Sequence, residues 1–237
     1  MNALLVTSLL VILLLAATTL SLPYSGFPPI SSSASTNNND NNEDFEDQNS
    51  IQICCAWGQE LRDGILTYNI DDDDISKDQK TVVQDAIEEW DKKVDLLNLE
   101  ELSGKKKSDI TIEFQDVDDD EATEGEDGIA GQTMTLFDDY GFIGKSEIII
   151  NKNVQGYEFD TKTIGQIAKH EIGHALGLGH ANFDGNLMAE EVNDGTAVVS
   201  DCETKAVIEA NYWKLGQNNY DVNSNPDYPD NNSMPCD

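Results

Sequence analysis

The three histidines of this 237-residue chain all fall within one short segment, H-E-I-G-H-A-L-G-L-G-H, which runs from His170 to His180. His170 and His174 are four residues apart, so on a helix their rings project from one face and can share a metal ion. Gly177 can adopt a left-handed conformation that ends the helix, and the turn then brings His180 back to the same metal. Three neutral imidazoles leave the fourth position open for water, which is the arrangement of a catalytic zinc site. The segment therefore constrains the chain to a helix, a sharp turn and a metal site.

Glu171 follows the first histidine and is turned from it by about 100° around the predicted helix. It can reach a metal-bound water without being a ligand, so we expect it to act as a general base. The pattern H-E-x-x-H alone occurs by chance, but here the third histidine and the intervening glycine stand at the required offsets. A purely structural zinc would need a fourth protein ligand and no adjacent carboxylate. We therefore favour a catalytic zinc over a structural zinc and over no metal.

Residues 56–215 carry the apolar periodicity of one folded domain. Alternating apolar residues predict strands at 66–70, 109–114, 128–137 and 147–151. Capping residues predict helix starts at Ser76 with Gln79 and at Ser200 with Glu203, and a third helix is predicted to open at Thr161. This order of strand, helix, strands, helix and helix indicates a mixed α/β domain.

The N-terminus carries an unbroken apolar run at residues 3–20, which predicts a secretory signal peptide within residues 1–22. Met1 and Asn2 supply no basic residue, and no clear cleavage site precedes Pro23. An uncleaved N-terminal membrane anchor is therefore the alternative. In both cases we expect the remainder of the chain to be extracellular, either secreted or held outside the membrane.

Two further segments are poor in apolar residues. Residues 23–55 are rich in Ser, Asn and Asp, and residues 216–237 are rich in Asn, Asp and Pro. Such compositions bury too little apolar surface to form a core. We therefore predict a disordered linker or short pro-segment at 23–55 and an extended tail at 216–237.

Charge excludes one class of partner. The chain has 46 acidic and 14 basic residues, for a formal net charge of −32. A surface this acidic repels phosphate backbones, so nucleic-acid binding is not expected. Repulsion between such surfaces also favours a soluble monomer. The negative charge should attract basic peptides, and the equal alternative is that the acidity serves solubility alone.

Four cysteines fit an extracellular compartment, and they allow three pairings. Adjacent cysteines such as Cys54 and Cys55 pair with each other only under strain, so we favour a disulfide between Cys202 and Cys236. Cys54 or Cys55 could instead cap the zinc in a latent form, but a structural disulfide is the preferred interpretation.

The histidine segment resembles the metzincin signature H-E-x-x-H-x-x-G-x-x-H and is most similar to that of the matrixin family. Met188, eight residues beyond His180, resembles the Met-turn methionine that underlies the zinc in this clan. The resemblance extends more weakly from about Trp57 to Leu215. It implies a metzincin-like catalytic domain, with a mixed twisted sheet of about five strands packed on a long helix and an active-site helix. A C-terminal helix is expected below the zinc cleft.

The resemblance also implies a zinc-dependent endopeptidase. Its single catalytic zinc would be bound by His170, His174 and His180, and Glu171 would be the general base. An extended peptide would lie antiparallel to an edge strand around Gly128–Thr135. Calcium is a second expectation, because acidic residues at 116–127, together with Asp138, Asp139 and Glu147, offer oxygen ligands.

Several departures from the family pattern qualify these expectations. Ala181 stands where matrixins commonly have Ser, and Glu190 stands where the related astacins have Tyr. No histidines remain for the family's second, structural zinc, and no Pro-Arg-Cys-Gly-x-Pro-Asp switch is present. The alternatives are a zinc hydrolase that acts on a non-peptide bond and a non-catalytic binding module stabilised by zinc. The intact Glu171 argues against the module.

Overall fold

The structure is a computed structural model, and its described part lies within residues 44–237. The described residues are 48–71, 73, 75–102, 107–117, 129–154, 156–190, 197–216 and 225–236. The predicted signal or anchor, residues 23–47 and most of the acidic loop lie outside them. Within the described residues, no helix combines the length and apolar character needed to cross a bilayer.

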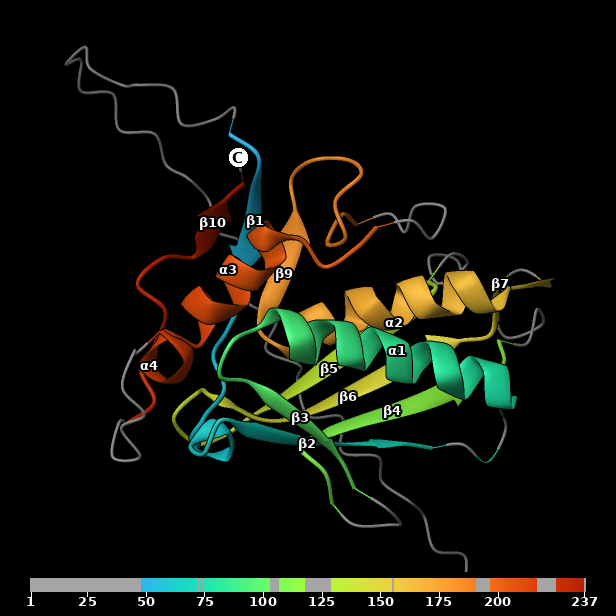
Figure 1. The fold of residues 1–237 in the computed structure, drawn as a ribbon, viewed down its shortest axis with the longest axis horizontal. Coiled ribbons are helices and arrows are strands. Elements are labelled where there is room, and N and C mark those ends of the chain that lie inside the picture. The colour runs from blue at the N-terminus through green and yellow to red at the C-terminus, as the bar shows by residue number, and fades with distance from the viewer. Residues whose placement is uncertain are drawn as a thin grey trace, which may run out of the picture. The chain divides into compact units, whose positions relative to one another are not determined.

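A five-stranded sheet forms the base of the domain, in the order β3-β2-β4-β6-β5 (Figure 1). Its strands are β2 (Ile65–Ile70), β3 (Asn98–Glu101), β4 (Ile110–Gln115), β5 (Gly131–Phe137) and β6 (Ile143–Asn151). β3, β2, β4 and β6 run parallel to one another, and β5 pairs antiparallel with β6 at one edge. The prediction of a mixed sheet of about five strands is therefore confirmed.

Two long helices, α1 (Lys77–Lys93) and α2 (Thr161–Ala175), cover the same face of this sheet. The capping box predicted at Ser76 is present, since its hydroxyl accepts from the Gln79 amide while the Gln79 side chain accepts from the Ser76 amide. The core between helices and sheet is formed by alternate strand residues and one helix face: Ile110, Ile112, Ile148, Ile150, Val83, Ile87, Trp90, Ile164 and Ile167. These apolar periodicities are the ones that the sequence shows.

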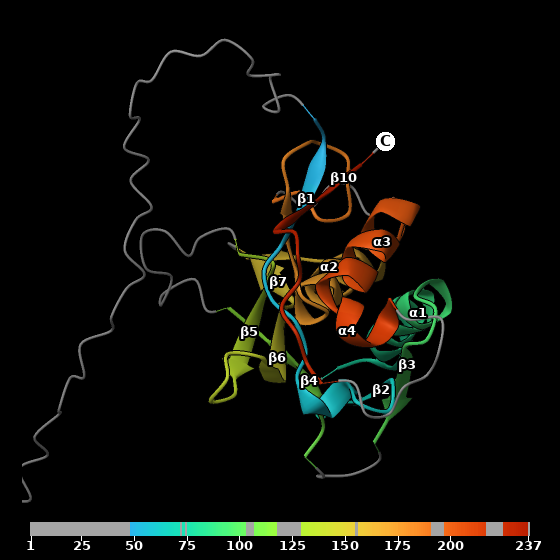
Figure 2. The same ribbon diagram turned by 90° about the vertical axis from the view of Figure 1, so that its left-hand side faces the viewer.

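A second layer of structure lies beside α2 and follows it in the chain (Figure 2). β9 (Leu178–Ala181) comes directly after α2, and α3 (Asp201–Ala210) and α4 (Tyr212–Leu215) close the domain. The capping box predicted at Ser200 with Glu203 is present. Short elements complete the described part: η1 (Gln59–Leu61), β7 (Asn153–Val154) and β8 (Tyr157–Glu158).

The prediction of disorder was wrong at the end of the 23–55 linker. Ser50–Ile53 form β1, which lies between β9 and β10 (Ser233–Pro235) in a separate antiparallel sheet. Ile51 is fully buried there, with 0 % of its surface exposed. The composition of residues 23–55 did not predict this strand, because composition describes only the local sequence. The two strands that pair with β1 lie more than a hundred residues further along the chain. The same sheet gives the predicted tail a strand of its own.

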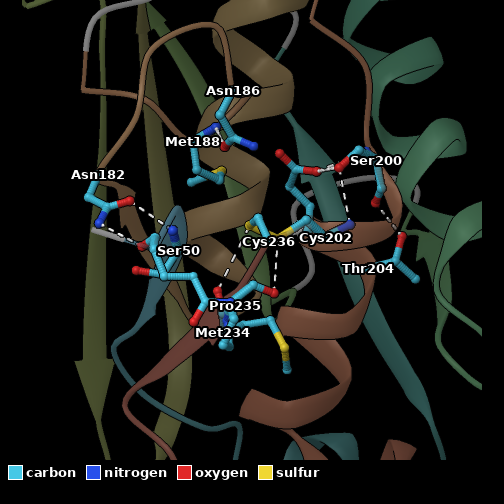
Figure 3. Close-up of a disulfide and its surroundings, with 12 residues drawn as sticks. Ser50, Asn182, Asn186, Met188, Ser200, Cys202, Thr204, Met234, Pro235 and Cys236 are labelled. Atoms are coloured by element: carbon cyan, nitrogen blue, oxygen red, sulfur yellow. Dashed lines mark hydrogen bonds between the residues drawn. A yellow bond between two sulfur atoms is a disulfide. The ribbon is translucent and has the colours of Figure 1, made fainter. Parts of the chain in front are cut away.

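Two disulfides are present among the described residues. Cys202 and Cys236 are joined with their Cα atoms 5.4 Å apart, as predicted, and tie α3 to the residue that follows β10 (Figure 3). Cys54 and Cys55 are joined to each other. Neither sulfur is therefore a free thiol that could cap the zinc, and the prediction of a structural disulfide is confirmed.

Candidate functional site

The turn at the end of α2 sets the geometry of the site. Gly177 has a φ of +103°, the left-handed conformation that the sequence predicts for it. A Cβ atom at this position would lie 2.3 Å from the main-chain oxygen of Cys55, so no larger residue fits. The close approach also allows the Gly177 carbonyl to accept a hydrogen bond of 2.9 Å from the Cys54 amide. Glycine therefore allows α2 to end and the chain to reverse into β9.

The structure brings the three histidines together. His170 and His174 project from α2, and His180 comes from β9. Each ring offers one nitrogen, and these nitrogens all lie within 4.8 Å of one another. The Nε2 atoms of His170 and His174 are 3.0 Å apart. Among the described residues, this is the group of side chains with the geometry to hold a metal ion.

Backbone carbonyls fix the protonation of two of the rings. The Nδ1 atom of His170 lies 2.8 Å from the Leu187 oxygen, and that of His174 lies 2.9 Å from the Leu178 oxygen. A carbonyl can only accept, so each Nδ1 carries the proton and each Nε2 presents a lone pair to the shared centre. This donor set of converging neutral imidazole nitrogens fits zinc.

Burial supports the neutral form of both rings. It is the main cause that lowers the pKa of His170, and it lowers the pKa of His174 to about 4, with a further contribution from the neighbouring His170. Neutral imidazole is the form that binds metal ions. The protein therefore presents His170 and His174 in the binding form at neutral pH.

Glu171 lies beside the three histidines but outside the group of potential ligands found among the described residues. Only 4 % of its surface is exposed, and this burial raises the pKa of its carboxyl to about 7. A hydrogen bond from the Thr133 hydroxyl acts in the opposite direction. A cation bound by the histidines would also favour the charged carboxylate.

Met188 is fully buried and packs against α2 at Gly173, where an added Cβ would lie 2.4 Å from the methionine sulfur. Gly173 directly precedes His174, so the methionine lies against the helix between the two histidines. The Met188 oxygen accepts a 2.7 Å hydrogen bond from Ala181, and its amide donates to the Asn186 side chain (Figure 3). This turn therefore connects the helix to β9 at the metal site.

The site opens into a cleft of about 940 Å³. Its lining includes residues of β5, the three histidines and residues of β9. Cys54, the candidate zinc-capping residue, lines the cleft, and so do residues that the sequence did not single out: Gln52, Thr133, Tyr157 and Phe159. No local signal identified Gln52, because it reaches the cleft through the pairing of β1 with β9. Thr133 could have been found as a polar residue on the inward face of a predicted strand.

The candidate calcium ligands take other roles where the structure describes them. Asp138 accepts hydrogen bonds from the amides of Tyr140 and Phe142, and Glu147 forms an ion pair of 2.6 Å with Lys145. Residues 118–127 of the acidic loop lie outside the described residues. A calcium site therefore stays a prediction.

Comparison with known proteins gives one informative match. The sequence model of a family described as Matrixin matches residues 56–212. No curated protein matches the chain. A solved structure described as the GM1-bound form of the ECX AB5 holotoxin is similar over 67 % of this chain and 77 % of that chain, with 16 % identity and a TM-score of 0.38. That similarity is too weak to carry an argument.

Proposed function

The chain belongs to the matrixin family, and on this premise we propose that it is an endopeptidase whose catalytic zinc is held by the three histidines and whose general base is Glu171. The family consists of zinc metallopeptidases, and the histidine cluster has the geometry to bind a metal. The observation that carries the proposal is the buried carboxylate of Glu171 beside three converging imidazoles, all of which line an open cleft. The family match covers residues 56–212, so β1 and β10 lie outside the matched residues.

The chemistry divides between the metal and the chain. Zinc held by His170, His174 and His180 would act as a Lewis acid, polarising a carbonyl and lowering the pKa of water. Glu171 accepts a proton from the water that attacks the scissile carbonyl carbon. The C–N bond then breaks, and Glu171 returns this proton to the departing amine nitrogen. The carboxylate therefore ends the cycle as it began.

The edge of the sheet supports a peptide as the substrate. β5 pairs with β6 on one side only, and within the described residues no strand pairs with its other side. Its inner face lines the cleft beside the histidines. An extended peptide can add to such an edge antiparallel to β5, so that main-chain hydrogen bonds supply affinity at any sequence. This edge favours a peptide over a non-peptide substrate, and the buried Glu171 beside the histidines argues against a non-catalytic module.

A peptide library tests the proposed function. We expect the purified protein to contain one zinc per chain, and to cleave a random peptide library until a chelator removes the metal. Elemental analysis and mass spectrometry of the products give the two readings. Bound zinc without cleavage of any peptide would support the binding module, and hydrolysis of esters or sugars alone would support the non-peptide hydrolase. Two tightly held zinc ions would contradict the single-zinc prediction.

The charge of the cleft suggests which peptides are preferred. Among its described lining residues, the acidic ones are Glu171 and Glu190, and none is Lys or Arg. We expect basic peptides to be cleaved with a kcat/KM about tenfold or more above that of matched acidic peptides at low salt. The gap should narrow as salt rises, because the Debye length is only about 10 Å at 0.1 M. Rates for both peptides across a salt series check this, and a preference insensitive to salt would leave the acidity with a role in solubility.

We also propose that the protein is exported. The apolar run at 3–20 supports this, and so do the two disulfides, because disulfides persist in oxidising compartments. Sequencing the N-terminus of protein recovered from the culture medium tests the proposal. A start after residue 22 supports a cleaved signal, recovery in the membrane fraction supports the anchor, and retention inside the cell contradicts export.

A further inference from the structure

The carboxylate of Glu171 is held from the side of β5. The Thr133 hydroxyl lies 2.7 Å from Glu171 Oε2, and it lies 3.0 Å from the main-chain oxygen of the same residue. A threonine hydroxyl carries one proton, and a bond to a charged carboxylate is stronger than one to a neutral carbonyl. The shorter contact is therefore the dominant one.

Gly131, two residues earlier on the same face of β5, supports the other side of the carboxylate. A Cβ atom at Gly131 would lie 2.7 Å from Glu171 Oε1 and 2.9 Å from its Cγ. The carboxylate thus packs directly on the bare backbone of the edge strand. Together, the glycine backbone and the threonine hydroxyl define where this carboxylate lies.

Within the described part of the chain, no ion pair reaches Glu171, and Thr133 supplies the hydrogen bond to its side chain. The last torsion of a glutamate side chain is soft, so packing alone sets the rotation of its carboxylate poorly. A proton acceptor, however, has to meet its donor at hydrogen-bond distance and in the right direction. The Thr133 hydroxyl is the group that supplies this orientation.

We propose that Thr133 is a positioning residue, which orients the carboxylate of Glu171 for proton transfer through its hydroxyl. The proposal rests on the proposed function, in which Glu171 is the base. In this proposal β5 has two roles: its free edge binds the peptide, and its inner face orients Glu171. Substrate and base would then be aligned by the same strand.

Three single variants test the proposal in the zinc-loaded protein. Thr133→Val keeps the shape of the side chain and removes the hydroxyl, and Thr133→Ser keeps the hydroxyl. Thr111→Val makes the same chemical change on β4, at a partly exposed position outside the cleft lining, and serves as the matched control. Zinc content and thermal unfolding establish that each variant is loaded and folded.

We expect Thr133→Val to lower kcat by about 10 to 100-fold, because a misplaced catalytic group costs this much, with little change in KM. Thr133→Ser should recover most of the loss, and Thr111→Val should behave as the wild type. In a Glu171→Ala background, Thr133→Val should have almost no further effect on kcat, because the group that it orients is gone. A Thr133→Val enzyme with normal kcat, a Thr133→Ser enzyme as slow as Thr133→Val, or an equal loss in the Glu171→Ala background would each overturn the proposal.

A second measurement does not depend on activity. The free energy of unfolding of the zinc-free protein can be measured in urea for the wild type, Thr133→Val, Glu171→Ala and the double variant. We expect Thr133→Val to destabilise the protein more when Glu171 is present, because a buried carboxylate then loses its donor. Equal losses in both backgrounds would show that only the main-chain contact matters, and the proposal would fail. If the unfolding free energies of the Thr133 and Glu171 variants are coupled but the protein cleaves no peptide, the contact exists and the proposed function is wrong.

Discussion

Replacing Glu171 with Ala should lower kcat by about 10²- to 10⁴-fold, the range that general-base catalysis contributes. The zinc content should remain at one per chain, because the three histidines and their carbonyl partners at Leu178 and Leu187 are untouched. The loss should appear in kcat and kcat/KM alike, since proton transfer acts in the transition state and not in substrate binding. Elemental analysis beside steady-state kinetics measures both quantities.

Two further variants control this experiment. Glu171→Gln keeps the size of the side chain and an oxygen that can accept from Thr133, but its amide cannot take up a proton, so it should be as slow as Glu171→Ala. Glu113→Ala removes an exposed carboxylate from β4, outside the cleft lining, and should leave the rate unchanged. Near-normal turnover by Glu171→Ala with zinc bound would remove this residue from the mechanism.

Replacing His180 with Ala should weaken zinc binding by more than about 100-fold, because losing even an outer partner of a ligand can cost that much. The remaining pair, His170 and His174, forms an incomplete site, so activity should be lost together with the metal. Dialysis against a mild chelator followed by elemental analysis measures the effect.

The fold of this variant needs its own control, because β9 also pairs with β1. Urea unfolding of the His180→Ala protein should match that of the wild type when both are stripped of zinc. Stoichiometric zinc after dialysis would show that His180 is not the third ligand. A large loss of stability in the zinc-free state would show instead that the imidazole supports β9.

Local signals predicted much of this structure. The hydroxyls of Ser76 and Ser200 each satisfy a free amide at a helix start, and that chemistry depends only on the next few residues. The turn at Gly177 is equally local, because a left-handed φ follows from the absence of a side chain. The spacing of His170 and His174 on one helix face belongs to the same class of signal.

Contacts between distant segments could not be predicted in this way. β1 is a strand because β9 and β10 lie on either side of it, and the sequence of Ser50–Ile53 does not indicate which segments pair with it. The contact between Thr133 and Glu171 spans 38 residues and depends on the register of β5 against β6 and on the packing of α2. Long-range register is set by the whole core, so local periodicity does not reveal it.

The position of β1 limits how this protein could be matured by proteolysis. β1 pairs through Ile51 and Ile53 with β9, the strand that carries His180, and the residues after it press on the turn at Gly177. A cut at residue 55 would therefore withdraw the strand that braces the third histidine and expose an unpaired edge on β9. We therefore expect that a maturation cut which removes an N-terminal segment falls before β1 and leaves its pairing with β9 intact.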